Sequence, residues 1–209
     1  ARRPALPPLC GGAIGFLCYN AARWFEKTLD DGKNFETDDA VWMFFRTILI
    51  FDRLKQRIEI VSIVFTDEAG GDESKLRNLY DAAVAETARI ERILHESSLP
   101  DLTSDNLQSP ETNQFSSNWK KEDFLAAVDA VKEKILAGDA YQVVLSQKFT
   151  RQTSAKAINI YRALRTTNPS PYMFYIKLGD STLIGASPEM LVRCHGRKLE
   201  YRPIAGTRQ

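Results

Sequence analysis

The chain has 209 residues, 28 of them basic and 27 acidic, so its formal net charge is only +1. Hydrophobic residues make up 44% of the sequence and charged residues 26%, which is the composition of a globular protein with a sizeable core. The basic residues are scattered singly rather than gathered into a patch with aromatic residues. This pattern excludes nucleic acid as an expected partner.

No apolar run approaches the ~20 residues that a membrane-spanning helix needs, and the first residues lack the pattern of a signal peptide. The three cysteines, Cys10, Cys18 and Cys194, are odd in number and lack the spacing of metal ligands. We interpret them as reduced thiols. We therefore expect the intact protein to work in the cytosol, without a membrane partner.

The first third of the sequence is rich in β-type runs. An apolar segment punctuated by glycines extends to Tyr19, and two later runs, 41–51 and 58–65, are predicted to pair as strands across a polar connection at 52–57. After Gly70, apolar residues recur with helical spacing and predict one long amphipathic helix whose stripe faces the core. The stripe comprises Leu76, Leu79, Tyr80, Ala83, Thr87, Ile90 and Leu94.

A stretch rich in Ser, Pro, Asp and Asn, residues 98–117, has the composition of a linker. It divides the chain into an N-terminal domain, 1–97, and a C-terminal domain, 118–209. The C-terminal domain begins with a second predicted helix, whose apolar face runs from Phe124 to Leu136. Acidic residues favour the start of this helix, and a glycine predicts its end. These residues are Glu122, Asp123 and Gly138.

A strand is predicted after the second helix, over residues 141–149. Alternation places Gln142, Val144, Ser146 and Lys148 on one face of it. A polar cavity and bulk solvent would both suit such a face, so the residues alone leave both interpretations open.

Three β-type runs near the C-terminus, 172–178, 181–185 and 190–194, are separated by turn signals and predict an antiparallel meander. A fourth run, 198–202, leads into a loop with Gly206, Thr207 and Arg208. Exposed amide groups, a hydroxyl and a guanidinium are the donors that a carboxylate ligand needs. An ordinary glycine turn is the alternative.

Four segments together resemble a known family. They read GDAYQVVLSQKF, NPSPYMFY, LIGASPEMLVR and RPIAGTR, and they begin at residues 138, 168, 183 and 202. In this order they are similar to the first half of the chorismate-binding domain of chorismate-utilising enzymes, most closely to the large subunit of anthranilate synthase. The segment 7–16, which contains GGAIG, resembles part of the preceding domain of that subunit.

This resemblance implies an α+β fold of layered, mostly antiparallel sheets covered by helices. Because the family's large subunit is considerably longer, we expect the chain to be a piece of a longer protein. Magnesium would hold the substrate carboxylate through ligands beyond Gln209.

Two positions discriminate among the branches of the family. In the water-using isochorismate and salicylate synthases, the position that matches Gln142 looks to be a lysine that activates water. Where this chain has Ala205, aminodeoxychorismate synthase has a nucleophilic lysine. Since both lysines are absent, the resemblance favours anthranilate synthase, an enzyme of the lyase class that uses ammonia. The other two branches and a non-catalytic, tryptophan-sensing fragment are the alternatives.

The resemblance also implies site residues and partners. Gln142 would line the active site, and Gly206 and Thr207 match positions that contact chorismate. Pro171, Tyr172 and Met173 match the pocket for the feedback inhibitor L-tryptophan. A separate glutamine amidotransferase subunit would supply the ammonia, because no part of this chain resembles a glutaminase.

Other residues receive structural interpretations. His95 falls near a helix end and His195 in a turn, and Glu189 resembles a family signature to which we assign a role in turn formation and packing. The sequence also departs from the family, since Cys18-Tyr19-Asn20 stands where many relatives have Gly-Tyr-Asp. That departure concerns a local domain contact rather than the chemistry.

Overall fold

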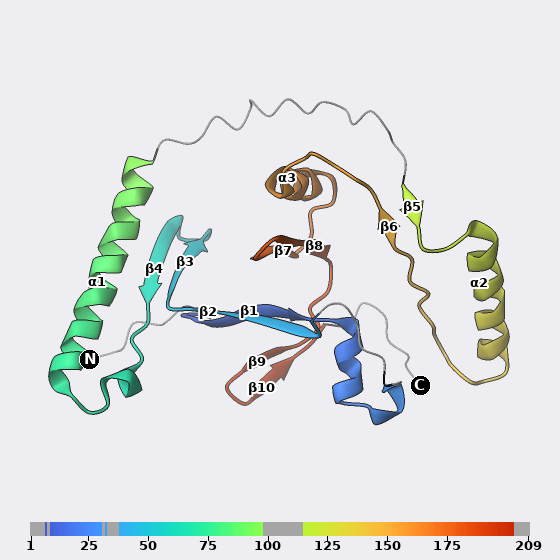
Figure 1. Ribbon diagram of the computed structural model, residues 1–209, viewed down its shortest axis with the longest axis horizontal. Helices are drawn as coiled ribbons and strands as arrows, with labels where there is room; N and C mark the ends of the chain where they lie inside the picture. Colours follow the sequence, from blue (N-terminus) through green and yellow to red (C-terminus); the bar gives the residue numbers. More distant parts are fainter. Residues whose placement is uncertain (1–6, 8, 31, 33–37, 98–114, 203–209) are drawn as a thin grey trace. The chain divides into compact units, whose positions relative to one another are not determined.

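The computed structural model describes residues 7, 9–30, 32, 38–97 and 115–202 of the chain (Figure 1). The chain divides into two compact units, Ala1–Leu102 and Thr103–Gln209. Among the described residues, no helix is both long enough and apolar enough to cross a membrane.

The N-terminal unit combines two antiparallel hairpins with one long helix. Strand β1 pairs with β2, and β3 pairs with β4. The elements in chain order are β1 (Gly12–Leu17), η1 (Tyr19–Trp24), η2 (Lys27–Leu29), β2 (Ala40–Phe45), β3 (Thr47–Asp52), β4 (Arg57–Ser62), η3 (Thr66–Ala69) and α1 (Glu73–Glu96).

The run predicted as one strand, 41–51, is two strands, so this prediction was wrong. The chain leaves one hairpin for the other at Arg46, whose carbonyl accepts a hydrogen bond from the Ile63 amide at 2.7 Å. The Arg46 guanidinium donates to the Glu68 carboxylate at 2.9 Å and lies over the Phe65 ring. Contacts with residues about twenty positions away therefore fix the point at which β2 ends and β3 begins.

The β1–β2 hairpin brings two backbones unusually close at Gly15. A Cβ atom at Gly15 would lie 1.8 Å from the Val41 carbonyl oxygen. Glycine is therefore required at this position of the GGAIG segment, because any side chain would push the strands apart.

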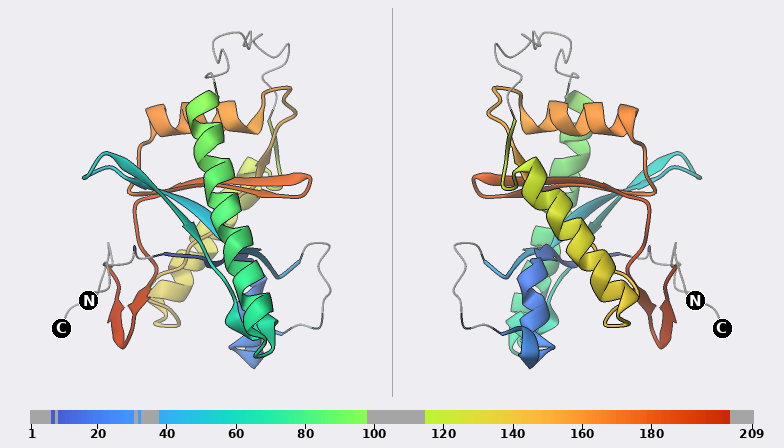
Figure 2. Two further views of the ribbon diagram at one scale, coloured as in Figure 1. Left: turned by 90° about the vertical axis from the view of Figure 1, so that its left-hand side faces the viewer. Right: turned by 90° about the vertical axis from the view of Figure 1, so that its right-hand side faces the viewer.

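The long helix was predicted correctly. It begins after Asp72, whose carboxylate accepts hydrogen bonds from the Ser74 and Lys75 amides at 2.8 and 3.2 Å. Helix α1 lies against β4 (Figure 2). The half-buried members of the predicted stripe are Leu79, Ala83, Thr87 and Ile90, whereas Leu76, Tyr80 and Leu94 are exposed.

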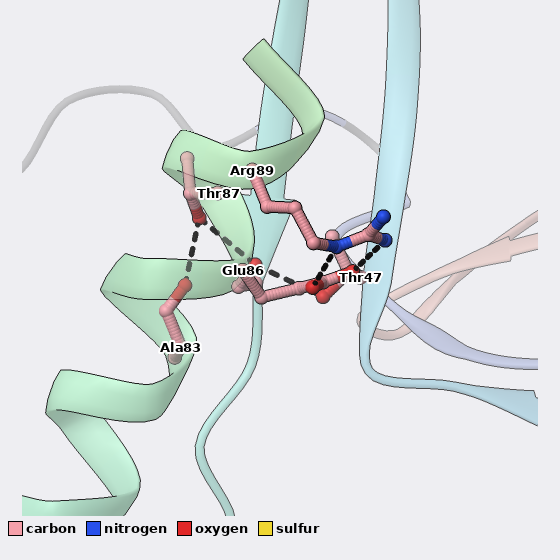
Figure 3. A network of polar contacts seen from close by, with 6 residues as sticks. Thr47, Ala83, Glu86, Thr87 and Arg89 are labelled. Carbon is pink, nitrogen blue, oxygen red and sulfur yellow. Dashed lines mark hydrogen bonds and ion pairs between the residues drawn. The ribbon is translucent and has the colours of Figure 1, made fainter. Parts of the chain in front are cut away.

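A chain of hydroxyl groups joins α1 to the β3–β4 hairpin (Figure 3). Thr47, Ser62 and Thr87 are linked in series, with 3.0 Å between successive hydroxyl oxygens, and the Thr87 hydroxyl donates to the Ala83 carbonyl at 3.0 Å. Because each hydroxyl has one proton, the last bond sets the direction of the others. Thr47 therefore donates to Ser62, and Ser62 donates to Thr87.

The C-terminal unit contains two helices and three short antiparallel sheets among its described residues. Strand β5 pairs with β6, β7 with β8, and β9 with β10. The elements in chain order are β5 (Ser116–Ser117), α2 (Lys121–Leu136), β6 (Phe149–Thr150), α3 (Ala157–Thr167), β7 (Tyr172–Leu178), β8 (Ser181–Ser187), β9 (Arg193–His195) and β10 (Lys198–Glu200).

Helix α2 confirms the prediction for the start of this unit, and three features differ from expectation. Residues 141–148 form no strand, because no described strand pairs with them; only the two residues of β6 are paired. The meander is two separate hairpins, since β9 pairs with β10 rather than with β8. Helix α3 was not predicted at all.

Helix α3 covers one face of the β7–β8 hairpin (Figures 1 and 2). The Tyr161 ring meets the Tyr175 ring edge to face, with the centroids 5.9 Å apart. On the opposite face, the Phe174 ring lies over Gly185, where a Cβ atom would be 2.1 Å from its Cζ. Antiparallel strand pairs, two of them with a helix packed against them, confirm the predicted α+β class.

Candidate active site

The segment that carries Gln142, residues 140–148, is called the return segment here because it leads back from the end of α2 to β6. Gln142 is exposed on this segment and makes no hydrogen bond, ion pair or ring contact with another described residue. Its neighbours Tyr141 and Val144 are 98% and 80% exposed. The amide of Gln142 is thus open to a ligand or to solvent, and both interpretations of the sequence remain.

The N-terminal end of the return segment is anchored to the end of α2. Gly138 adopts a left-handed conformation with φ of 83°, and its amide donates to the Ile135 carbonyl at 3.0 Å. The Asp139 amide donates to the Lys134 carbonyl at 3.0 Å, and the two side chains form an ion pair at 3.1 Å. This glycine-terminated helix end fixes where the return segment starts.

The other end of the return segment is held by the turn Ser117-Asn118-Trp119, which precedes α2. The Asn118 side chain accepts from the Lys148 amide at 2.7 Å, and the Asn118 amide donates to the Lys148 carbonyl at 3.1 Å. The Trp119 indole N–H donates to the Ser146 carbonyl at 3.1 Å. Sequence reasoning missed this turn, because its contacts join residues about thirty positions apart.

The predicted carboxylate-binding loop cannot be placed. Gly206, Thr207 and Arg208 lie outside the described residues, as does Ala205. The described chain reaches Arg202, just after the hairpin of β9 and β10.

The predicted inhibitor residues lie at the start of β7. Pro171 is exposed, and Tyr172 and Met173 are half-buried. Because side chains alternate along a strand, Tyr172 and Met173 lie on opposite faces of the β7–β8 hairpin. Met173 shares the face of Tyr175, against which α3 packs, whereas Tyr172 shares the face of Phe174. One flat ligand therefore cannot rest on both side chains through the same face.

The residues given structural interpretations lie in the expected places. His95 is in the last turn of α1, and His195 ends β9 before a turn in which Gly196 has a φ of 59°. The Glu189 amide donates to the Ser187 hydroxyl at 3.3 Å, forming the expected turn. No described cysteine forms a disulfide.

The described residues do not supply a magnesium site. Within them, no group of three or more His, Cys, Asp or Glu side chains is placed to hold a metal ion.

A hollow of about 360 Å³ lies between α1 and the segment after β4. Its wall is mostly apolar and comprises Val64, Thr66, Glu73, Leu76, Arg77 and Tyr80. None of the sequence-predicted site residues lines this hollow, so we do not assign the active site to it.

Comparison with known proteins decides the family. A family model described as chorismate binding enzyme matches residues 1–209. The chain belongs to the chorismate-binding enzyme family. Its α+β fold is shared with a solved relative, the crystal structure of anthranilate synthase component I from Streptococcus pneumoniae. That structure aligns with a TM-score of 0.73 and 27% identity over 94% of this chain and 42% of the relative.

Relatives of this chain carry the names of two branches of the family, anthranilate synthase and aminodeoxychorismate synthase. The chain is 35% identical to anthranilate synthase component 1 of Streptomyces coelicolor over 213 residues, which cover 98% of the chain and 40% of the relative. It is 34% identical to aminodeoxychorismate synthase component 1 of Bacillus subtilis over 206 residues, 97% of the chain and 41% of the relative. The chain thus spans about 40% of the length of these relatives.

Proposed function

We propose that the intact protein is the large subunit of an anthranilate synthase, which converts chorismate and ammonia to anthranilate, pyruvate and water. The observation that carries the proposal is the pair of residues Gln142 and Ala205, which stand where the other branches of the family have lysines. The similarity to anthranilate synthase components supports it.

The chemistry requires a nucleophile that does not depend on either lysine. Neutral ammonia has a lone pair and attacks C2 of chorismate directly, while the C4 hydroxyl leaves as water after taking up a proton. Loss of the C2 proton and of the enolpyruvyl group then gives the aromatic ring and pyruvate. A glutamine amide cannot accept a proton at neutral pH, so Gln142 would position groups by hydrogen bonds rather than act as a base.

The remaining parts of the site are proposals of the same kind. Gly206 and Thr207 would contact chorismate through an amide and a hydroxyl, and magnesium would bind to ligands beyond Gln209. Ammonia would come from a separate glutamine amidotransferase subunit. We also propose a cytosolic location, because the substrate and the thiols both fit that compartment.

The product of the intact protein tests the proposal. With chorismate, magnesium and ammonium, we expect fluorescent anthranilate and pyruvate in equal amounts, and no conversion when ammonium is omitted. Conversion without ammonium would identify a water-using isochorismate or salicylate synthase. An amino product formed without pyruvate would identify an aminodeoxychorismate synthase, the name carried by one relative.

Inhibition by L-tryptophan is the second element of the proposal, and the strand geometry sharpens its test. Met173→Thr alters the hairpin face that carries α3, and Tyr172→Ala alters the opposite face. We expect Met173→Thr to weaken inhibition about 10- to 200-fold, the effect of losing one good apolar contact, while turnover with ammonia persists. If only Tyr172→Ala weakens inhibition, tryptophan binds on the uncovered face and Met173 is a packing residue. A wild type that ignores tryptophan contradicts the proposal.

A further inference from the structure

We propose that the turn Ser117-Asn118-Trp119 is a positioning element that holds Gln142 in the active site, with Trp119 and Asn118 as its two working residues. The proposal rests on the proposed function for the role of Gln142. It goes beyond that function because it assigns a task to residues outside the predicted set of site residues.

No described strand pairs with residues 140–148, and we infer that the length of the return segment keeps it extended. Helix α2 has 16 residues and is therefore about 24 Å long. The return segment has nine residues, which reach about 30 Å when extended. It begins at one end of α2 and meets Trp119 just before the other end, so it has little slack.

Both ends of the return segment are fixed, and Gln142 lies between them. The glycine-terminated end of α2 fixes the first end, and the turn fixes the second through Ser146 and Lys148. The Gln147 side chain adds a hydrogen bond to the Ser117 hydroxyl at 3.0 Å. With no partner strand among the described residues, these contacts take the place of a ladder in setting the register of the segment.

Trp119 also connects the return segment to α2. Its ring meets the Phe124 ring edge to face, with the centroids 5.7 Å apart, while its indole N–H holds the Ser146 carbonyl. Ser146 lies four residues after Gln142, which is about 13 Å along an extended chain, and shares its face by alternation. Loss of the indole hydrogen bond would therefore let the face that carries Gln142 shift relative to α2.

Substitutions in the intact protein separate positioning from simple packing. Trp119→Phe keeps a ring against Phe124 and removes only the N–H donor. We expect kcat for anthranilate formation with ammonia to fall about three- to tenfold, the range of one hydrogen bond, while KM for chorismate changes less than about twofold. Trp24→Phe is the matched control, because Trp24 lies in the other unit and its indole donates to no described residue.

Asn118 provides the conservative rescue. Asn118→Ala removes the acceptor of the Lys148 amide and should lower kcat, whereas Asn118→Asp keeps that acceptor and should restore most of it. Wild-type values of kcat in both Trp119→Phe and Asn118→Ala would overturn the proposal. So would a loss of kcat that Asn118→Asp does not restore and that accompanies a lower Tm.

Amide hydrogen exchange makes the two proposals independently testable. In Trp119→Phe and Asn118→Ala, we expect faster exchange in the peptide that spans 141–149 and unchanged exchange in α2. Unchanged exchange in that peptide would overturn the positioning role, even if chorismate proves not to be the substrate. A wild type that makes no anthranilate while these exchange differences appear would contradict only the proposed function.

Discussion

Both units place one helix against a two-stranded antiparallel hairpin, but different groups join the two layers. In the N-terminal unit, hydroxyl groups of Thr47, Ser62 and Thr87 connect the hairpin to α1. In the C-terminal unit, the rings of Tyr161 and Tyr175 meet between α3 and β7. Hydrogen bonds are directional and aromatic contacts tolerate small shifts. We infer that the first helix is locked in register and that the second can adjust, which would suit the inhibitor site proposed at β7.

The largest effect that we expect comes from filling the space beneath Phe174. In Gly185→Ala, the added methyl would clash with the Phe174 ring, whose atoms lie 2.1 to 2.9 Å from the new Cβ position. We expect the hairpin to lose about 1–3 kcal/mol, measured by hydrogen exchange of the β7 and β8 amides.

A double variant tests the cause of that loss. In Gly185→Ala combined with Phe174→Ala, the clash is absent, so the combined loss should be smaller than the sum of the two single losses. Additive losses would mean that the ring swings away without cost and that the C-terminal unit packs more loosely than described.

A smaller effect should follow from breaking the hydroxyl chain. Thr87→Val keeps the shape of the side chain, removes its bond to the Ala83 carbonyl and leaves Ser62 without an acceptor on α1. We expect α1 to lose about 1 kcal/mol of local stability, measured by the exchange of its amides.

Thr167→Val is the matched control for Thr87→Val. Thr167 makes the same bond, from its hydroxyl to the carbonyl four residues earlier, at 3.0 Å, but it is exposed. Its replacement should change stability by only a few tenths of a kcal/mol. Equal losses of stability at the two positions would show that the hydrogen bond from Ser62 to Thr87 contributes nothing. The proposed difference between the hydroxyl-linked and the aromatic helix contacts would then be wrong.

The smallest effect concerns acid. Hydrogen bonds from Arg46 and Arg89 hold the pKa values of the Glu68 and Glu86 carboxyls below their usual range. A lowered folded pKa stabilises the protein above the ordinary carboxyl pKa, about 4.3, and this contribution is lost as the pH falls through the lower folded value.

Thermal unfolding between pH 7 and pH 3 measures the effect of acid. Tm should be level down to about pH 5 and fall below it, and Glu86→Gln should fall less steeply, because it has one carboxylate fewer to protonate. High salt should shrink the difference, since both pairs are exposed. A Glu86→Gln variant with the wild-type pH dependence of Tm would show that the ion pair between Glu86 and Arg89 does not contribute to the acid sensitivity of the N-terminal unit.

The helices that were predicted correctly have local signals. α1 has an apolar stripe and a capping aspartate, and α2 ends at Leu136, two residues before the left-handed Gly138. The break between β2 and β3 depends instead on partners that are distant in sequence. No local signal marks the break at Arg46, which depends on Ile63 and Glu68.

The choice of strand partners near the C-terminus depends on a turn that is close in sequence, at Gly196. The residues around Ser187 correctly predict a turn, yet the turn at Gly196 gives β9 a closer partner in β10. Helix α3 was not predicted, although Ile158, Tyr161 and Leu164 recur at helical spacing in it.

The candidate site could be predicted only in part. Gln142 was selected through family resemblance, since the alternation around it suits a cavity and solvent equally well. The Trp119 contact with Ser146 spans 27 positions, and no pattern in the sequence marks it. Family resemblance therefore selects Gln142 as a site residue, whereas the structure shows that Trp119 holds the segment on which Gln142 lies.

The arrangement of β3, β4 and α1 has a consequence for how the chain folds. The three elements lie within residues 47–96, with only the short η3 between β4 and α1. Because β3 and β4 are joined by a four-residue turn, their contacts are short in sequence. Low contact order favours rapid folding. We expect this stretch to form early, before β1 closes onto β2 across the 22 residues between them. The break at Arg46 would then separate an early-folding hairpin from a late one.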